Sequence, residues 1–163
     1  MENRPGAVDD LARLYREAVR QHAAHPVGYG VKIDATHQHE KYNPLCGDRV
    51  LVLLRVRNER VDAAAFEGQA CAICMASASM LCELAPGKMV AEVIEISEQL
   101  NEALCRRGPW PRPTEEKIIE NSRGHEPLLQ PLLGVKPFPS RIRCATLPWD
   151  AAIQALSGDP PLG

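Results

Sequence analysis

Strand-like sequence is confined to one part of the chain, where three short stretches follow one another with only brief connections between them. The stretches are residues 31–40, 49–57 and 61–67, and they are rich in alternating or β-branched apolar residues, as half-buried strands are. Antiparallel strands can be joined by a tight turn, whereas parallel strands need a crossover of a dozen or more residues. The short polar connections therefore predict an antiparallel meander.

Helical sequence surrounds this region, with apolar residues at helical spacing and with glycine or proline at several of the ends. The predicted helices span residues 7–22, 72–84, 88–107, 114–121 and 139–156. A chain of 163 residues is long enough to bury one core of its own. We therefore expect a single domain over residues 1–163, with its core at about 7–157. Its fold class should be α+β, a small three-stranded antiparallel sheet with helices packed on one side.

The composition narrows the classes of function. A net charge of -2 and an aromatic content of 4% argue against a nucleic-acid partner. The apolar runs are too short to cross a bilayer, and residues 1–10 do not read as a secretory signal, so we expect a cytoplasmic protein with no membrane partner. Thiols stay reduced in the cytoplasm, so six cysteines indicate metal or redox chemistry in preference to structural disulfides.

Three of the cysteines lie at predicted element boundaries. Cys46 lies in the turn before the second strand, Cys71 lies where the third strand gives way to a helix, and Cys144 lies in the first turns of the last helix. A helix N-terminus lowers the pKa of a thiol, and we expect this for Cys71 and Cys144. Asp48, two residues after Cys46, can reach the same point. Three thiolates and a carboxylate suit zinc or iron, although three buried cysteines and a turn-capping aspartate would show the same spacing.

Three separated runs of residues also resemble a known family. They are Asn-Pro-Leu-Cys-Gly-Asp at 43–48, Phe-Glu-Gly-x-x-Cys at 66–71, and Pro-x-Arg-Ile-x-Cys-Ala-Thr-Leu at 139–147. Together, and in this order, they resemble the SufU branch of the IscU/NifU-like iron–sulfur cluster assembly proteins. The long spacing between the last two cysteines of these runs, and Arg143 where the IscU branch has histidine, favour the SufU branch.

The resemblance implies a zinc site with Cys46, Asp48, Cys71 and Cys144 as ligands. It also implies a pyridoxal-phosphate (PLP)-dependent cysteine desulfurase, SufS-like, as a partner, and a downstream cluster scaffold or recipient protein. Cys144 would accept persulfide sulfur. We expect Asp48 to be the ligand that leaves the metal, because a single carboxylate binds zinc more weakly than a thiolate does. The chain would then be a sulfurtransferase-like acceptor of sulfur rather than a conventional enzyme.

Two other functions fit the same ligands. The first is a scaffold that binds iron, assembles a transient [2Fe–2S] cluster and transfers it to other proteins. The second is an inert adaptor that keeps zinc for structural reasons alone. Metal analysis, an absorption spectrum and a desulfurase assay distinguish the three.

Two positions depart from the family pattern. Cys74 stands where the family usually has serine, which creates a Cys71-x-x-Cys74 motif. Cys74 is either a small core residue, an alternative ligand, or a redox-active or resolving thiol. Pro148 falls inside the last predicted helix and removes the N–H that would bond to the carbonyl of Cys144, so we expect either a kink or a later helix start.

Overall fold

The computed structural model describes residues 5–105 and 126–157. The predicted helix at 114–121 lies outside these ranges. Three strands and six helical segments are described, and they are α1 (Pro5–Ala24), β1 (His37–Asn43), β2 (Asp48–Arg57), β3 (Arg60–Gln69), α2 (Ala72–Leu84), α3 (Val90–Cys105), α5 (Glu126–Leu129), the 3₁₀ helix η1 (Gln130–Val135) and α6 (Pro139–Ser157).

The three strands form one antiparallel sheet in the order β1-β2-β3, so the predicted meander is confirmed. The β2–β3 turn consists of Asn58 and Glu59, whose φ angles of 52° and 62° are both positive, as in the tight turns that match the twist of a hairpin. Along β2 the side chains alternate between buried and more exposed, so one face of the sheet carries the core.

The predicted start of the first strand is wrong. Residues 31–36 are not in a strand, and β1 begins only at His37. The preceding segment is tied to the opposite edge of the sheet, because Gly30 donates its N–H to Phe66 and Phe66 donates its N–H to Gly28. Residues 31–36 must therefore cross from the β3 edge to the β1 edge, and an apolar–polar alternation cannot reveal such a crossing.

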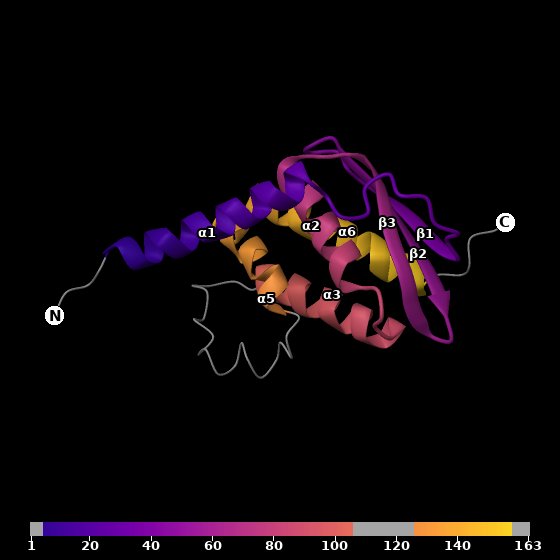
Figure 1. Cartoon of the computed structure of the whole chain (residues 1–163). Coiled ribbons are helices and arrows are strands. Elements are labelled where there is room, and N and C mark those ends of the chain that lie inside the picture. The colour runs from indigo at the N-terminus through magenta and orange to yellow at the C-terminus, as the bar shows by residue number, and fades with distance from the viewer. Residues whose placement is uncertain (1–4, 106–125, 158–163) are drawn as a thin grey trace.

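Helices cover one side of the sheet, as the sequence predicts (Figure 1). α6 packs against β1 and β2, α2 packs against β3 and α6, and α3 packs against α6. The bounds of α2 match the predicted ones, and α6 continues through Pro148 without interruption. The largest fully buried side chains come from the sheet and from several helices, and they include Trp149, Phe66, Leu54, Met80 and Leu81. These side chains belong to a single hydrophobic core.

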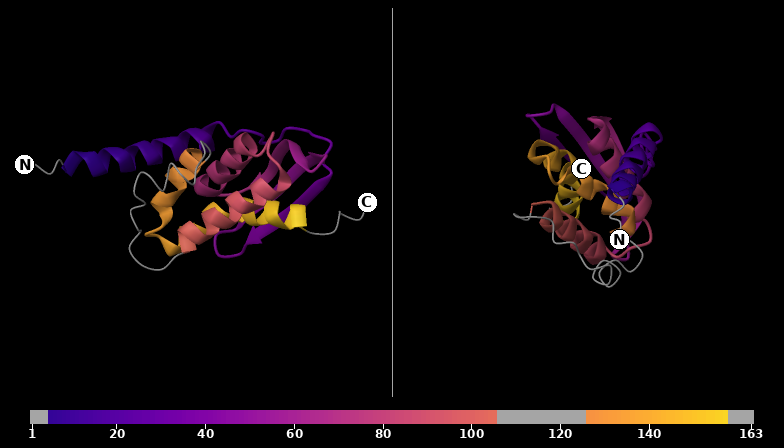
Figure 2. Two further views of the ribbon diagram at one scale, coloured as in Figure 1. Left: turned by 90° about the horizontal axis from the view of Figure 1, so that it is seen from below. Right: turned by 90° about the vertical axis from the view of Figure 1, so that its left-hand side faces the viewer.

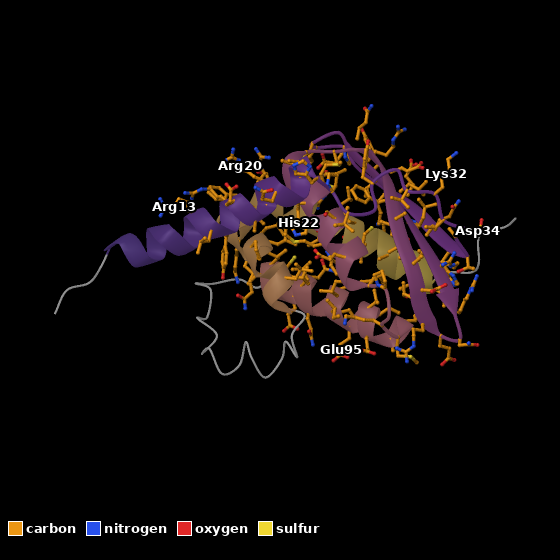
Figure 3. All side chains as sticks on the ribbon, in the orientation of Figure 1. Arg13, Arg20, His22, Lys32, Asp34 and Glu95 are labelled. Atoms are coloured by element: carbon orange, nitrogen blue, oxygen red, sulfur yellow. The ribbon has the colours of Figure 1, made fainter. Side chains whose placement is uncertain are left out.

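The first helix is held by polar contacts near its C-terminal end. Its N-terminal end extends beyond the rest of the molecule (Figures 1 and 2). His22 points toward α2 (Figure 3), and its Nδ1 lies 2.8 Å from the Oγ of Ser79. The same oxygen accepts the N–H of Val27 at 2.8 Å. No helix among the described residues is both long and apolar enough to span a membrane.

Gly68 is a position where the fold requires glycine. It pairs with Val50 in the β2–β3 ladder and has a φ of +137°, a region open essentially to glycine alone. A Cβ at this position would overlap with the carbonyl oxygen of Arg49. We expect Gly68→Ala to lower the free energy of unfolding by about 2–4 kcal/mol in urea denaturation, since strain and overlap add.

Gly30→Ala is the matched control for this prediction. Gly30 also has a positive φ of +70°, but nothing lies within 4 Å of the position that a Cβ would take there. Its substitution should cost about 1–2 kcal/mol, the ordinary penalty for a side chain in this conformation. Equal losses in Gly68→Ala and Gly30→Ala would contradict overlap with Arg49 as the cause.

Candidate metal centre

The β1–β2 turn presents Cys46 and Asp48. Asn43 ends β1 and organises the turn, because its Oδ1 accepts the N–H of Leu45 and its carbonyl accepts the N–H groups of Cys46 and Gly47. Gly47 has a φ of 71°, which lets the chain reverse so that Asp48 pairs with Asn43 across the sheet. Cys46 is thereby exposed at the turn, whereas Asp48 is buried at the first position of β2.

The start of α2 is joined to Asp48 directly. Cys71 is the N-cap residue of α2, with an extended backbone (φ −66°, ψ 166°) and no side-chain cap. Its N–H donates to the Oδ1 of Asp48 at 2.8 Å. A carboxylate at a helix N-terminus interacts favourably with the helix dipole. The strand-to-helix boundary predicted at Cys71 therefore lies beside the carboxylate predicted to share its site.

The third part of the candidate metal centre is Cys144, which α6 provides. Cys144 is fully buried, and its Sγ lies 3.6 Å from the Sγ of Cys46. The ligand atoms of Cys46, Asp48 and Cys144 all lie within 4.8 Å of one another. Ser77 of α2 helps to position α6 here, because its hydroxyl donates to the carbonyl of Ala145, the residue after Cys144. Residues 98 positions apart in the chain are thus brought within reach of one ion.

Cys71 stands slightly apart from this three-residue group. It is not among the residues whose ligand atoms all meet the 4.8 Å limit. Its side chain is nevertheless a neighbour of Cys144. Burial raises the pKa of Cys144, and the side chains of Asp48, Cys71 and Cys46 beside it raise that pKa further. The structure therefore brings three of the four predicted ligands together, with the fourth adjacent to them.

The predicted effect of the helix terminus on Cys144 is wrong for the metal-free chain. Cys144 lies in the second turn of α6, and the helix dipole acts mainly within the first turn. Its pKa is raised, primarily by burial. Cys71, in contrast, occupies the helix N-terminus as expected. Metal binding would release the protons of these thiols, because the thiolate is the form of cysteine that binds a metal ion.

The donor set fits a metal ion. The Oδ2 of Asp48 is buried and has no hydrogen-bond partner among the described residues. A buried carboxylate oxygen without a partner carries a desolvation cost, which coordination of a cation would remove. Thiolates from Cys46, Cys71 and Cys144 with one Asp48 oxygen make the four donors that zinc accepts in a tetrahedral site.

The supporting role of Ser77 has no signal in the sequence pattern, because this serine lies among several small helical residues. The turn at Asn43 is predicted by the sequence, because asparagine before a proline commonly initiates a turn. Cys74 is fully buried in the core. Of the remaining cysteines, Cys82 is buried on α2 and Cys105 is exposed at the end of α3, and neither belongs to the three-residue group.

Comparisons with known proteins agree with this architecture. The family model described as "NifU-like N terminal domain" matches residues 14–117. The zinc-dependent sulfurtransferase SufU of Bacillus subtilis is 32% identical over 87% of this chain and 88% of its own length. The iron–sulfur cluster assembly scaffold protein IscU of Streptococcus pyogenes is 29% identical over 92% and 87%. A NifU-like N-terminal domain from Brucella abortus, 21% identical, shares the fold with a TM-score of 0.74 over 90% of this chain and 94% of its own.

Proposed function

This chain belongs to the family of NifU-like N-terminal domains, and we propose that it acts in iron–sulfur cluster assembly as a zinc-bound acceptor of sulfur. The observation that carries the proposal is the convergence of Cys46, Asp48 and Cys144 within 4.8 Å, with Cys71 tied to Asp48. We also propose that residues 1–163 form one domain, which the single hydrophobic core supports. A cytoplasmic location is consistent with the unpaired state of all six cysteines.

The proposed ligands are Cys46, Asp48, Cys71 and Cys144. Bound zinc would hold the thiolates ionised and protect them from stray oxidation. Asp48 is the ligand expected to leave first, because a single carboxylate is a weaker anchor for zinc than a thiolate. Its Oδ1 already accepts the N–H of Cys71, so the carboxylate retains a partner when its other oxygen is released.

Sulfur would arrive from a partner protein that carries a cysteine persulfide. The Sγ of Cys144 attacks the terminal sulfur of that persulfide, a new S–S bond forms on Cys144, and the partner's cysteine departs as a thiolate. A PLP-dependent cysteine desulfurase, SufS-like, is the class of enzyme that generates such a persulfide. Because Cys144 is buried, the partner must approach past Cys46, which is exposed 3.6 Å from it.

The surface around this entrance supports docking of a protein. Leu45, directly before Cys46 in the turn, is a large apolar residue that is 77% exposed. Large apolar side chains exposed beside a reactive centre are typical of a protein interaction surface. The sulfur would then pass to a downstream cluster scaffold or recipient protein.

A second candidate function is a scaffold that assembles a [2Fe–2S] cluster on the same four side chains. The similarity to the Streptococcus pyogenes scaffold protein favours it, and thiolates with one oxygen ligand suit iron as well as zinc. An inert structural zinc site has less support, because structural sites are closed and Cys46 is exposed.

The protein purified without oxygen should be colourless, contain about one zinc per chain, and raise the turnover of a SufS-like desulfurase. Element analysis, an absorption spectrum and sulfide production with and without the protein measure these properties. A brown protein with iron and sulfide would favour the scaffold. Zinc without any stimulation of the desulfurase would favour the adaptor and contradict the proposal. Cys105→Ser serves as the control, since this exposed cysteine lies outside the three-residue group.

A further inference from the structure

We propose that Cys74 is a resolving thiol, which releases sulfide from a persulfide on Cys71 and leaves a Cys71–Cys74 disulfide. This inference rests on the proposed function as a sulfur acceptor. It assigns a chemical role to a cysteine that the four-ligand site does not use.

The start of α2 provides the geometry for such a pair. Cys71 is the N-cap residue and Cys74 lies in the first turn of the helix. Side chains three residues apart lie on the same face of a helix, with about 5–6 Å between their Cβ atoms. A disulfide needs about 3.5–4.5 Å. The extended backbone of Cys71 keeps it outside the regular helix, so it can close this difference without unwinding α2.

Cys74 also belongs to the surroundings of the metal centre. Burial raises the pKa of its thiol, and the charges of Asp48, Cys71 and Cys46 raise it further, which places the sulfur near all three. Ser77 lies three residues beyond Cys74, hence on the same face of α2, and it contacts Ala145 of α6. The Cys71–Cys74 pair therefore faces the helix that carries Cys144.

Cys74 differs from the other buried cysteine of α2. The Cβ and Sγ of Cys82 lie next to Gly28, so Cys82 faces the segment before β1 and not the metal centre. Once Cys46, Cys71, Cys144 and Asp48 are assigned to the metal, Cys74 is the remaining described cysteine beside it. Cys74 is thus a fourth sulfur-bearing side chain, buried next to a complete set of four ligands, and it remains available for chemistry.

The chemistry balances without an external oxidant. A persulfide on Cys144 first exchanges its terminal sulfur with the thiol of Cys71, which takes that sulfur as Cys144 recovers its thiol. The Sγ of Cys74 then attacks the inner sulfur on Cys71, the persulfide S–S bond breaks, and the terminal sulfur leaves with the electron pair. The Cys74 proton accompanies it, so hydrogen sulfide and a Cys71–Cys74 disulfide are formed. A dithiol reductant restores the two thiols for the next round.

The test follows sulfur through the full-length protein. Zinc-loaded protein, free of oxygen, is given inorganic polysulfide as donor, desalted, and monitored for free sulfide and by intact mass and peptide mapping. In the natural protein, we expect the mass of one added sulfur to give way to the loss of two hydrogens, mapped to Cys71 and Cys74. In Cys74→Ser, persulfide should persist and sulfide release should be slower by about tenfold or more, because the intramolecular attack is lost.

Cys82→Ser is the matched control, as another buried cysteine of α2 changed to serine, and it should release sulfide at the natural rate. Zinc content and circular dichroism verify that each variant is folded, and Cys74→Ala repeats the test with a different side chain. Release from Cys74→Ser at the natural rate, or a disulfide mapped to Cys46 and Cys144, would overturn the inference while leaving sulfur uptake intact. Failure of the natural protein to take up sulfur, from polysulfide and from a desulfurase alike, would instead contradict the proposed function.

Discussion

Replacing Cys144 by serine is expected to weaken zinc binding by about 100-fold or more and to abolish persulfide uptake. Four-ligand zinc sites bind with a total of roughly 10–16 kcal/mol, so one thiolate contributes about 3 kcal/mol, and each 1.4 kcal/mol is a factor of ten. Serine is close to cysteine in size but offers no thiolate. Competition with a coloured zinc chelator measures the affinity, and intact mass after desulfurase treatment measures the uptake.

Cys82→Ser separates loss of a ligand from the cost of a buried hydroxyl. Both cysteines are buried in helices, but Cys82 is outside the three-residue group. Cys82→Ser should therefore bind zinc as the natural protein does. This holds even if Cys82→Ser and Cys144→Ser unfold at a similar temperature that is lower than that of the natural protein. Zinc affinity in Cys144→Ser equal to that of Cys82→Ser would show that Cys144 is not a ligand.

Asp48→Ala is expected to keep its zinc, exchange it more slowly, and lose about tenfold or more of its sulfur uptake. Three thiolates still hold the ion, but they bear more of its charge and become weaker nucleophiles without the exchangeable carboxylate. The variant also loses the acceptor of the Cys71 N–H, at a cost of about 1–2 kcal/mol to the metal-free fold. Zinc release to a chelator and single-turnover persulfide transfer measure the two effects.

Asp48→Asn is the matched variant for this prediction. Its amide oxygen can still accept the N–H of Cys71, so the stability of the metal-free chain should recover in part. Its uptake of sulfur should stay low, because an amide lacks the charge of the carboxylate. Normal persulfide transfer to either variant would contradict the role given to Asp48.

Much of the fold follows from local pattern. β2 and β3 were predictable because alternation and the polar turn at Asn58 and Glu59 act over a few residues. The start of β1 was not predictable, since the backbone hydrogen bonds that join Gly28 and Gly30 to Phe66 link segments that are far apart in the sequence. The later helix start expected from Pro148 is wrong, because α6 already begins at Pro139 and includes Pro148. Packing of α6 against β1, β2, α2 and α3 offsets the one backbone hydrogen bond that proline removes.

The candidate site was predictable to a similar degree. Turn and boundary positions, together with the family resemblance, predicted Cys46, Asp48, Cys71 and Cys144 as ligands, and the structure brings three of them within 4.8 Å of one another. The thiol pKa of Cys144 could not be predicted from its place in the helix, because burial depends on the elements packed around it. The positioning role of Ser77 could not be predicted either, because the carbonyl that accepts its hydrogen bond belongs to a residue 68 positions away.

X-ray absorption at the zinc edge, on the full chain purified without oxygen, tests the central claim most directly. Three thiolates and one carboxylate predict three sulfur atoms at about 2.3 Å and one oxygen at about 2.0–2.2 Å from the ion. A shell of four sulfurs would put Cys74 in the place of Asp48. That result, or a shell with fewer than three sulfurs, would contradict the assignment of Cys46, Asp48, Cys71 and Cys144 as one metal centre.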